Sequence, residues 1–215
     1  MSVRNQLIAA GRLLVDMGLS PGATGNLSIR DGDMILVTGT GASLGHLTEA
    51  DIAEVSLAGV HLGGARPSKE TPLHVGFYGR GEEHQAIVHL HSPQAVAMSC
   101  RNRWSEGNAV PPLTPYFVMR VGQTPLLPYR HPGDAALGED IRSAPGPFRA
   151  ALLANHGSVV SGKDLSDAVE RAAELEEACR IALLTENAPR RELTPEQIRE
   201  LADRWDSPWT HSPVD

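Results

Sequence analysis

Residues 86–93, AIVHLHSP, place two histidines, His89 and His91, two positions apart in a stretch that alternates as a β-strand does. Successive side chains of a strand point to opposite faces, so both imidazoles are expected on the same face. Two imidazoles placed in this way can bind one divalent metal ion. Two half-buried strand histidines without a metal would fit the same spacing, so the pair alone leaves both interpretations open.

A third histidine, His156, precedes a glycine in another strand-like run, LLANHG. A catalytic zinc site commonly has three protein ligands and one open position, and these three histidines could supply the nitrogens. Glu70, in the segment PSKE, could then move a proton beside a carbonyl polarised by the ion, or it could merely cap its helix. The other histidines lack such partners and are interpreted as surface or core residues: His46, His61, His74, His84, His131 and His211.

Two glycine-rich loops could hold a phosphate group. Residues 24–26, TGN, and 38–41, TGTG, offer unobstructed backbone N–H groups together with hydroxyl donors. Ser68 would add a hydroxyl at the N-terminus of the helix expected over residues 70–78. Each loop alone is also compatible with an ordinary turn. The candidate phosphate-binding residues are Thr24, Gly25, Asn26, Thr40, Gly41, Ser68 and Lys69.

Composition favours one folded domain. The chain has 215 residues, of which 41% are hydrophobic and 21% charged, and we expect a domain over 1–206 and a weakly structured tail over 207–215. The net charge of −7 and the pI near 5.7 do not favour a nucleic-acid-binding surface. No apolar run approaches membrane-spanning length, so a cytoplasmic protein without membrane contact is predicted, with Cys100 and Cys179 as free thiols.

Helical and strand-like patterns interleave along the chain. The hairpin formed by residues 26–30 and 34–38 argues against a purely parallel sheet. The pattern therefore predicts an α/β protein, a three-layer α/β/α single domain with a mostly antiparallel central sheet. Helices are expected over 3–17, 70–78, 93–100 and 164–186 and from Thr194 onward, further strands over 55–60, 86–91 and 150–155, and ordered loops over 111–115 and 124–146.

The motifs TGNLS (24–28), TGTG (38–41), PSKE (67–70), HLHSP (89–93) and NHG (155–157) occur in that order. This set resembles the class II aldolase/adducin superfamily, the L-fuculose-phosphate aldolase-like proteins, over about residues 5–185. The resemblance implies a zinc-dependent lyase with one Zn²⁺ per subunit, held by His89, His91 and His156, and with Glu70 as the acid/base. It also implies a homotetramer, in which Tyr116 is the candidate for a tyrosine that a neighbouring subunit contributes.

Within this superfamily, longer segments of the sequence resemble the 3-oxo-tetronate 4-phosphate decarboxylase subgroup. These segments are TGASLG (40–45), KETPLH (69–74), PPLTPYFVMR (111–120), LLPYRHPGD (126–134) and LLANHGSVVSG (152–162). That subgroup implies a phosphorylated sugar acid as substrate, converted through an enediolate to dihydroxyacetone phosphate and CO₂. The alternatives are a class II sugar-phosphate aldolase, an epimerase or dehydratase, and a non-catalytic adducin-like interaction domain. The chain departs from the subgroup pattern at Arg130 and His131, whose roles stay open.

Overall fold

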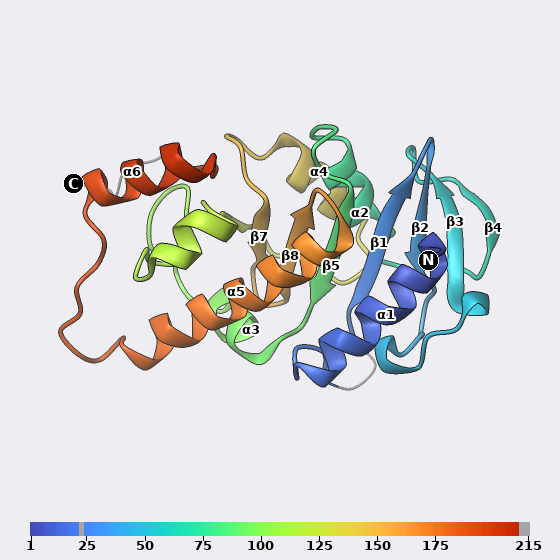
Figure 1. Ribbon diagram of the computed structural model, residues 1–215, viewed down its shortest axis with the longest axis horizontal. Coiled ribbons are helices and arrows are strands. Elements are labelled where there is room, and N and C mark those ends of the chain that lie inside the picture. The colour runs from blue at the N-terminus through green and yellow to red at the C-terminus, as the bar shows by residue number, and fades with distance from the viewer. Residues whose placement is uncertain (22–23, 211–215) are drawn as a thin grey trace.

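An eight-stranded sheet lies between two layers of helices (Figure 1) in the computed structural model, which describes residues 1–21 and 24–210. The strand order is β4-β3-β2-β1-β5-β8-β7-β6, and only the β6–β7 pair is parallel. The strands are β1 Asn26–Asp31, β2 Met34–Thr38, β3 Ile52–Ser56, β4 His61–Gly64, β5 Ala86–Leu90, β6 Leu126–Leu127, β7 Ala150–Leu153 and β8 Gly157–Gly162. The helices are α1 Val3–Asp16, α2 Thr71–Tyr78, α3 Pro93–Ser99, α4 Ala136–Ser143, α5 Leu165–Leu184 and α6 Pro195–Trp205, with a π-helix over Phe117–Val121.

The two faces of the sheet carry separate hydrophobic cores. Apolar side chains of α1, α3 and α5 pack on one face, and those of α2 and α4 pack on the other. Strand β5 shows the alternation directly, because Val88 and Leu90 enter the first core while Ile87 enters the second. The predicted three-layer α/β/α architecture with a mostly antiparallel sheet is therefore confirmed. The same alternation turns His89 toward the side of the sheet that α2 covers.

Several regions of the secondary structure differ from the sequence prediction, among them strand β8, which was not predicted. The strand expected over 55–60 is wrong in its bounds, since β3 ends at Ser56, a turn follows, and β4 begins at His61. The stretch 124–146, expected as loop, contains β6 and α4. Helix α4 is stabilised by its packing on α2, where Gly76 and Gly138 lie so close that a Cβ on Gly76 would meet the Gly138 carbonyl oxygen at 2.5 Å. Such tertiary packing outweighs the weak local propensity of a short, Gly-containing segment.

The last described residues pack on the domain. The backbone N–H of Gln123 donates to the Pro208 carbonyl at 2.7 Å, and its side chain accepts from the Thr210 N–H at 2.8 Å. Trp209 packs edge-on against Phe117 with ring centroids 6.0 Å apart. Residues 207–210 thus form no helix or strand but contact the domain, while residues 211–215, including His211, lie outside the described part of the chain.

Both edges of the sheet are short. Strand β4 has four residues, and its register against β3 shifts between Glu54 and Val55. At the other edge, β6 pairs with β7 through two residues only.

Two expectations about the chain as a whole can be compared with the structure. Across residues 1–21 and 24–210, none of the helices combines the length and apolar character needed to span a bilayer. Both cysteines are free thiols, Cys100 exposed and Cys179 buried, as predicted.

Candidate active site

Three imidazoles and one carboxylate meet where β5 ends. The Nε2 atom of His91 lies 3.0 Å from Nε2 of His89 and 3.0 Å from Nε2 of His156. Glu70 completes the group, with Oε2 3.2 Å from His89 Nε2 and Oε1 3.0 Å from His156 Nε2. One ligand atom from each of the four residues lies within 4.8 Å of the others, an arrangement that could hold a metal ion.

A divalent cation satisfies the close nitrogen–nitrogen contacts of this cluster better than protons do. His89 Nδ1 lies 2.8 Å from the Ser158 carbonyl oxygen, so it carries a proton and donates it. Its Nε2 atom faces Nε2 of His91 and the carboxylate of Glu70. Nε2 of His91 faces two other Nε2 atoms, and one proton cannot satisfy both contacts. A divalent cation between the lone pairs removes the conflict, and the Ser158 carbonyl then fixes the tautomer of His89.

His156 reaches the cluster through the tight turn between β7 and β8. Asn155 has a left-handed conformation, with φ of 56°, which asparagine tolerates better than most residues. Gly157 follows, and a Cβ there would lie 2.4 Å from the Leu90 carbonyl oxygen and 3.1 Å from Cδ2 of His91. The segment NHG therefore combines a turn residue, the imidazole and a residue without a side chain, so that the turn can approach β5 closely.

Glu70 lies immediately before the first residue of α2 and is only 8% exposed. Burial raises the pKa of this carboxyl, but the imidazoles of His156 and His89 lower it by more, so the pKa lies well below its usual range. Its Oε2 accepts a hydrogen bond of 2.9 Å from the Asn26 amide, whereas Oε1 has no partner in hydrogen-bond geometry among the described residues. Glu70 thus has one oxygen held by Asn26 and a second, buried oxygen that faces the imidazole of His156 at 3.0 Å.

The predicted phosphate loops converge beside this cluster. A cavity of about 250 Å³ is lined by residues of both glycine-rich loops and of the segment PSKE. Gly25 allows the first loop to approach β5, since a Cβ there would lie 2.9 Å from the His89 carbonyl oxygen. All seven candidate phosphate-binding residues line the cavity, together with Glu70 and His91: Thr24, Gly25, Asn26, Thr40, Gly41, Ser68 and Lys69.

A buried polar network lies behind Glu70 and was not predicted from the sequence. His74, interpreted as a surface or core residue, bonds Asn26 Oδ1 through Nε2 at 2.5 Å and Ser28 Oγ through Nδ1 at 2.7 Å. Tyr78 continues the network, with its hydroxyl 2.8 Å from Ser28 Oγ. Burial lowers the pKa of His74 to about 3, so its imidazole is neutral at neutral pH. Because both amide atoms of Asn26 are bonded within the protein, its side chain orients Glu70 rather than facing the cavity as a free donor.

A sequence signal for the network exists. Glu70, His74 and Tyr78 are four residues apart, as side chains on one helix face are, and Asn26 and Ser28 are two apart, as on one strand face.

Three candidate residues lie away from the cluster. Tyr116 is 57% exposed and does not line the cavity beside Glu70. Arg130 forms a two-point ion pair with Asp140, at 2.7 and 3.1 Å, and the side chain of His131 is exposed. From that segment, Pro132 reaches the cavity.

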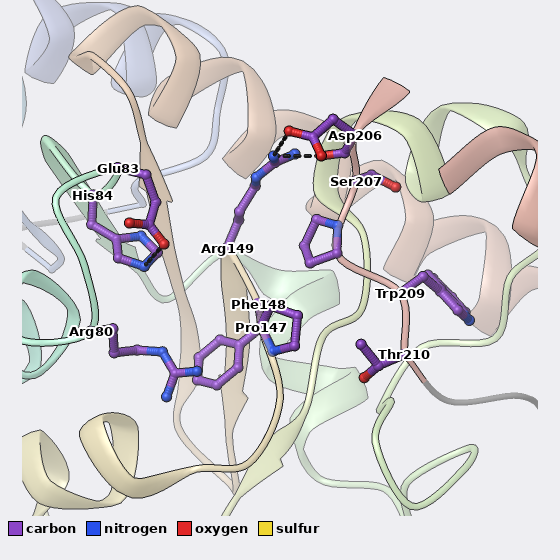
Figure 2. A pocket seen from close by; sticks show the side chains of 11 residues that line it. Arg80, Glu83, His84, Pro147, Phe148, Arg149, Asp206, Ser207, Trp209 and Thr210 are labelled. Carbon is purple, nitrogen blue, oxygen red and sulfur yellow. Dashed lines mark hydrogen bonds and ion pairs between the residues drawn. The ribbon is translucent and has the colours of Figure 1, made fainter. Parts of the chain in front are cut away.

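A second, larger pocket of about 630 Å³ lies at the opposite end of β5 (Figure 2). Its cationic side chains are already bound to the protein backbone. Arg80 donates to the carbonyls of Ile141 and Gly146 at 2.7 and 2.5 Å, and Arg149 donates to the carbonyl of Asp206 at 2.6 Å. These groups attach α4 and the C-terminal segment rather than facing a ligand.

Comparison with known proteins agrees with this geometry. The family model for the class II aldolase and adducin N-terminal domain matches residues 5–183. The chain belongs to the class II aldolase and adducin family. The resemblance drawn from the motifs is thereby confirmed.

Members of the class II aldolase and adducin family with assigned activities match most of the chain. A 3-oxo-tetronate 4-phosphate decarboxylase from Haemophilus influenzae is 38% identical over 205 residues, which cover 95% of this chain and 98% of the relative. An L-fuculose phosphate aldolase from Methanocaldococcus jannaschii is 35% identical over 181 residues, covering 84% and 96%. The crystal structure of YgbL from Klebsiella pneumoniae superposes with a TM-score of 0.88 at 38% identity, covering 93% and 97%.

Proposed function

We propose that this protein is a zinc-dependent carbon–carbon lyase acting on a phosphorylated sugar acid, a 3-oxo-tetronate 4-phosphate decarboxylase. One observation carries the proposal: a carboxylate, three imidazoles and the glycine-rich loops meet at one cavity. The decarboxylase from Haemophilus influenzae supports the choice of reaction, because its similarity extends over nearly the whole of both chains.

The ligand set fits Zn²⁺. Three imidazole nitrogens with the proton of His89 fixed on Nδ1 are borderline ligands that zinc accepts, and the Glu70 carboxylate lies within 4.8 Å of them. When bound there, the ion supplies a Lewis acid that polarises a substrate oxygen. The residues His89, His91 and His156 would hold it.

Glu70 is the proposed acid/base. Its Oε2 is held by Asn26, so the carboxylate has a fixed orientation from which it would carry a solvent-derived proton to the substrate carbon that has lost CO₂; the solvent supplies the one proton that the reaction consumes. A positioned group of this kind contributes about 10²–10⁴ in rate. The product is then dihydroxyacetone phosphate. In an aldol cleavage of a sugar phosphate the same carboxylate would instead accept the proton of a hydroxyl group.

The cavity lining suits a substrate anion despite the net charge of −7. Lys69 is exposed beside the cavity and forms no ion pair within the described residues, so its ammonium group is available for a phosphate. Ser68 adds a hydroxyl, and the loops around Gly25 and Gly41 add backbone N–H groups. Together these donors replace part of the hydration shell of the phosphate.

The protein is further proposed to be a cytoplasmic homotetramer whose domain spans 1–206. Tyr116 supports a site shared between subunits, because it is exposed and does not line the cavity of its own chain. It would then contact substrate in a neighbouring subunit.

The second candidate function is a class II sugar-phosphate aldolase. The similarity to the Methanocaldococcus jannaschii aldolase favours it, and the same carboxylate and imidazoles would serve. The two activities differ in the leaving fragment, which is CO₂ in one case and an aldehyde in the other.

A product assay separates the two functions. The zinc-loaded protein is incubated with 3-oxo-tetronate 4-phosphates and, separately, with fuculose 1-phosphate, while CO₂ and dihydroxyacetone phosphate are measured independently. We expect equal amounts of both products from the first substrate and no turnover of the second. Dihydroxyacetone phosphate from fuculose 1-phosphate, without CO₂, would establish the aldolase instead.

The variant Glu70→Gln tests the assigned role. It retains shape and should retain zinc, but turnover should fall by about 10²–10⁴ because the proton acceptor is lost. Glu139→Gln, on the exposed face of α4, is the matched control and should behave as wild type. Near-normal turnover of Glu70→Gln with full zinc content would refute the acid/base role; capping is not the alternative, because the Glu70 side chain makes no capping hydrogen bond to α2.

A further inference from the structure

Four consecutive hydrogen bonds connect Tyr78 to Glu70 through the interior of the protein. Their lengths are 2.8 Å from Tyr78 to Ser28, 2.7 Å from Ser28 to His74, 2.5 Å from His74 to Asn26 and 2.9 Å from Asn26 to Glu70. The first four of these residues are at most 6% exposed. Water therefore does not compete for these bonds, and each group depends on its protein neighbours.

The direction of every bond follows from the two ends. The Glu70 carboxylate can only accept, so the Asn26 amide donates to it through Nδ2 and presents Oδ1 to His74. A neutral His74 must then carry its proton on Nε2 and accept at Nδ1. The acceptor at Nδ1 receives the Ser28 hydroxyl proton, and Ser28 accepts in turn from the Tyr78 hydroxyl. All four donors thus point toward Glu70.

The residues of this hydrogen-bonded network lie on two rigid elements, β1 and α2. Asn26 and Ser28 occupy one face of β1, and His74 and Tyr78 lie one turn apart on α2. Side chains placed on a strand and a helix are held more precisely than side chains on loops. The tautomer of His74 therefore decides which way the Asn26 amide faces.

We propose that His74 is a positioning residue for Glu70. Its Nε2–H holds the Asn26 oxygen, which turns the amide NH₂ toward Oε2 of Glu70 and so fixes the orientation of the carboxylate, with Oε1 toward His156. This inference rests on the acid/base role proposed for Glu70 and extends it to residues that touch neither substrate nor metal. If His74 lost its donor, Asn26 could present either end to the carboxylate.

The first test is the tautomer itself, measured by long-range ¹H–¹⁵N correlation spectra of the histidine rings in wild-type protein, metal-free and zinc-loaded. We expect His74 to be neutral with its proton on Nε2 in both forms at pH 7. A proton on Nδ1, or on both nitrogens, would reverse the bonds and overturn the proposal. This measurement requires no substrate, so it stands even if the decarboxylase assignment fails.

The second test compares two substitutions of His74 in the zinc-loaded enzyme. His74→Leu removes the donor, and kcat should fall about 10- to 100-fold with KM within about threefold, as for other groups that orient site residues. His74→Gln keeps one donor and one acceptor and should recover most of the lost kcat. Zinc content should equal that of wild type in both variants.

A matched control exists in His84, which is also buried and is bonded to a serine hydroxyl at 2.7 Å but lies outside the network. His84→Gln should leave kcat unchanged. Equal kcat in His74→Leu and wild type, or no recovery in His74→Gln when it is folded and zinc-loaded, would overturn the positioning role. If His74→Leu does not fold, the tautomer and the His74→Gln kinetics decide the question. A wild-type protein without decarboxylase activity but with the expected tautomer would contradict the proposed function alone.

Discussion

Gly157→Ala is expected to damage the metal site without adding or removing a polar group. The new Cβ would lie 2.4 Å from the Leu90 carbonyl oxygen, whereas a carbon–oxygen contact normally requires about 3.3 Å. The turn must therefore move by roughly 1 Å, which is several times the tolerance of about 0.2 Å for metal–ligand distances. His156 is the residue before Gly157 and moves with it.

The cost of such overpacking is about 1–3 kcal/mol. In the metal-free variant the turn can shift to relieve the clash, and zinc binding must then return it to the wild-type position. The cost of that return weakens zinc binding by roughly 5- to 150-fold. Zinc affinity is measured by competition with a chromophoric chelator. Gly45→Ala is the control, because Gly45 also lacks a positive φ but its Cβ would meet only Val15 at 3.4 Å. Zinc affinity within twofold of wild type in Gly157→Ala would refute the steric argument.

Three further outcomes follow from individual side chains. Burial lowers the pKa of His84 to about 4, so as the pH falls the unfolded chain binds a proton before the folded protein does. The free energy of unfolding should therefore be constant above about pH 6.5 and fall by about 1.4 kcal/mol per pH unit from there to about pH 4. Urea unfolding at pH 7 and pH 5 should show this fall in wild type, whereas His84→Gln should lack the part that His84 contributes. Lys69→Met should raise KM at least about tenfold, with kcat within a few fold, in steady-state kinetics, because a cation beside the phosphate is lost. Glu176 accepts from Gln94 and Ala95 N–H groups at 2.8 Å each, so Glu176→Gln should lower the free energy of unfolding by about 1–2 kcal/mol in urea.

Regular alternation made much of the fold predictable. The hairpin of β1 and β2 and the strand β5 follow from side chains that alternate between two apolar cores. Helix α6 follows from a capping box, in which Thr194 and Gln197 bond each other's backbone N–H groups. These signals are local, so they can be read without knowledge of distant contacts.

Elements that depend on distant contacts were missed. Helix α4 forms because Gly138 fits against α2, and β6 has two residues whose only strand partner is β7. Strand β8, Gly157–Gly162, contains two glycines and two serines and owes its conformation to β5 and β7 on either side. Neither kind of stabilisation appears in the sequence pattern of the segment itself.

Part of the candidate site could likewise be predicted from local sequence patterns, and part depends on contacts between distant segments. The predicted grouping of His89, His91 and His156 is present, because two of them share one strand face and the third sits on a recognisable turn. The position of Asn26 at the cavity was predicted, but its bond to His74 was not, since a single histidine on an apolar helix is most often a core residue. The spacing shared with Glu70 became informative only once β1 and α2 were known to face each other.

The short edges of the sheet limit how copies of this protein can associate. An open sheet exposes unpaired N–H and C=O groups at both ends, which can recruit strands from other molecules. Here the register shift in β3 and the four-residue length of β4 interrupt one edge, and β6 offers two residues at the other. Leu62 on β4 is 56% exposed, but β4 is too short to offer a long row of backbone groups with which a strand of another molecule could pair. Short, interrupted edges of this kind disfavour association by continuation of the sheet, so side-chain surfaces are the favoured route by which copies would associate.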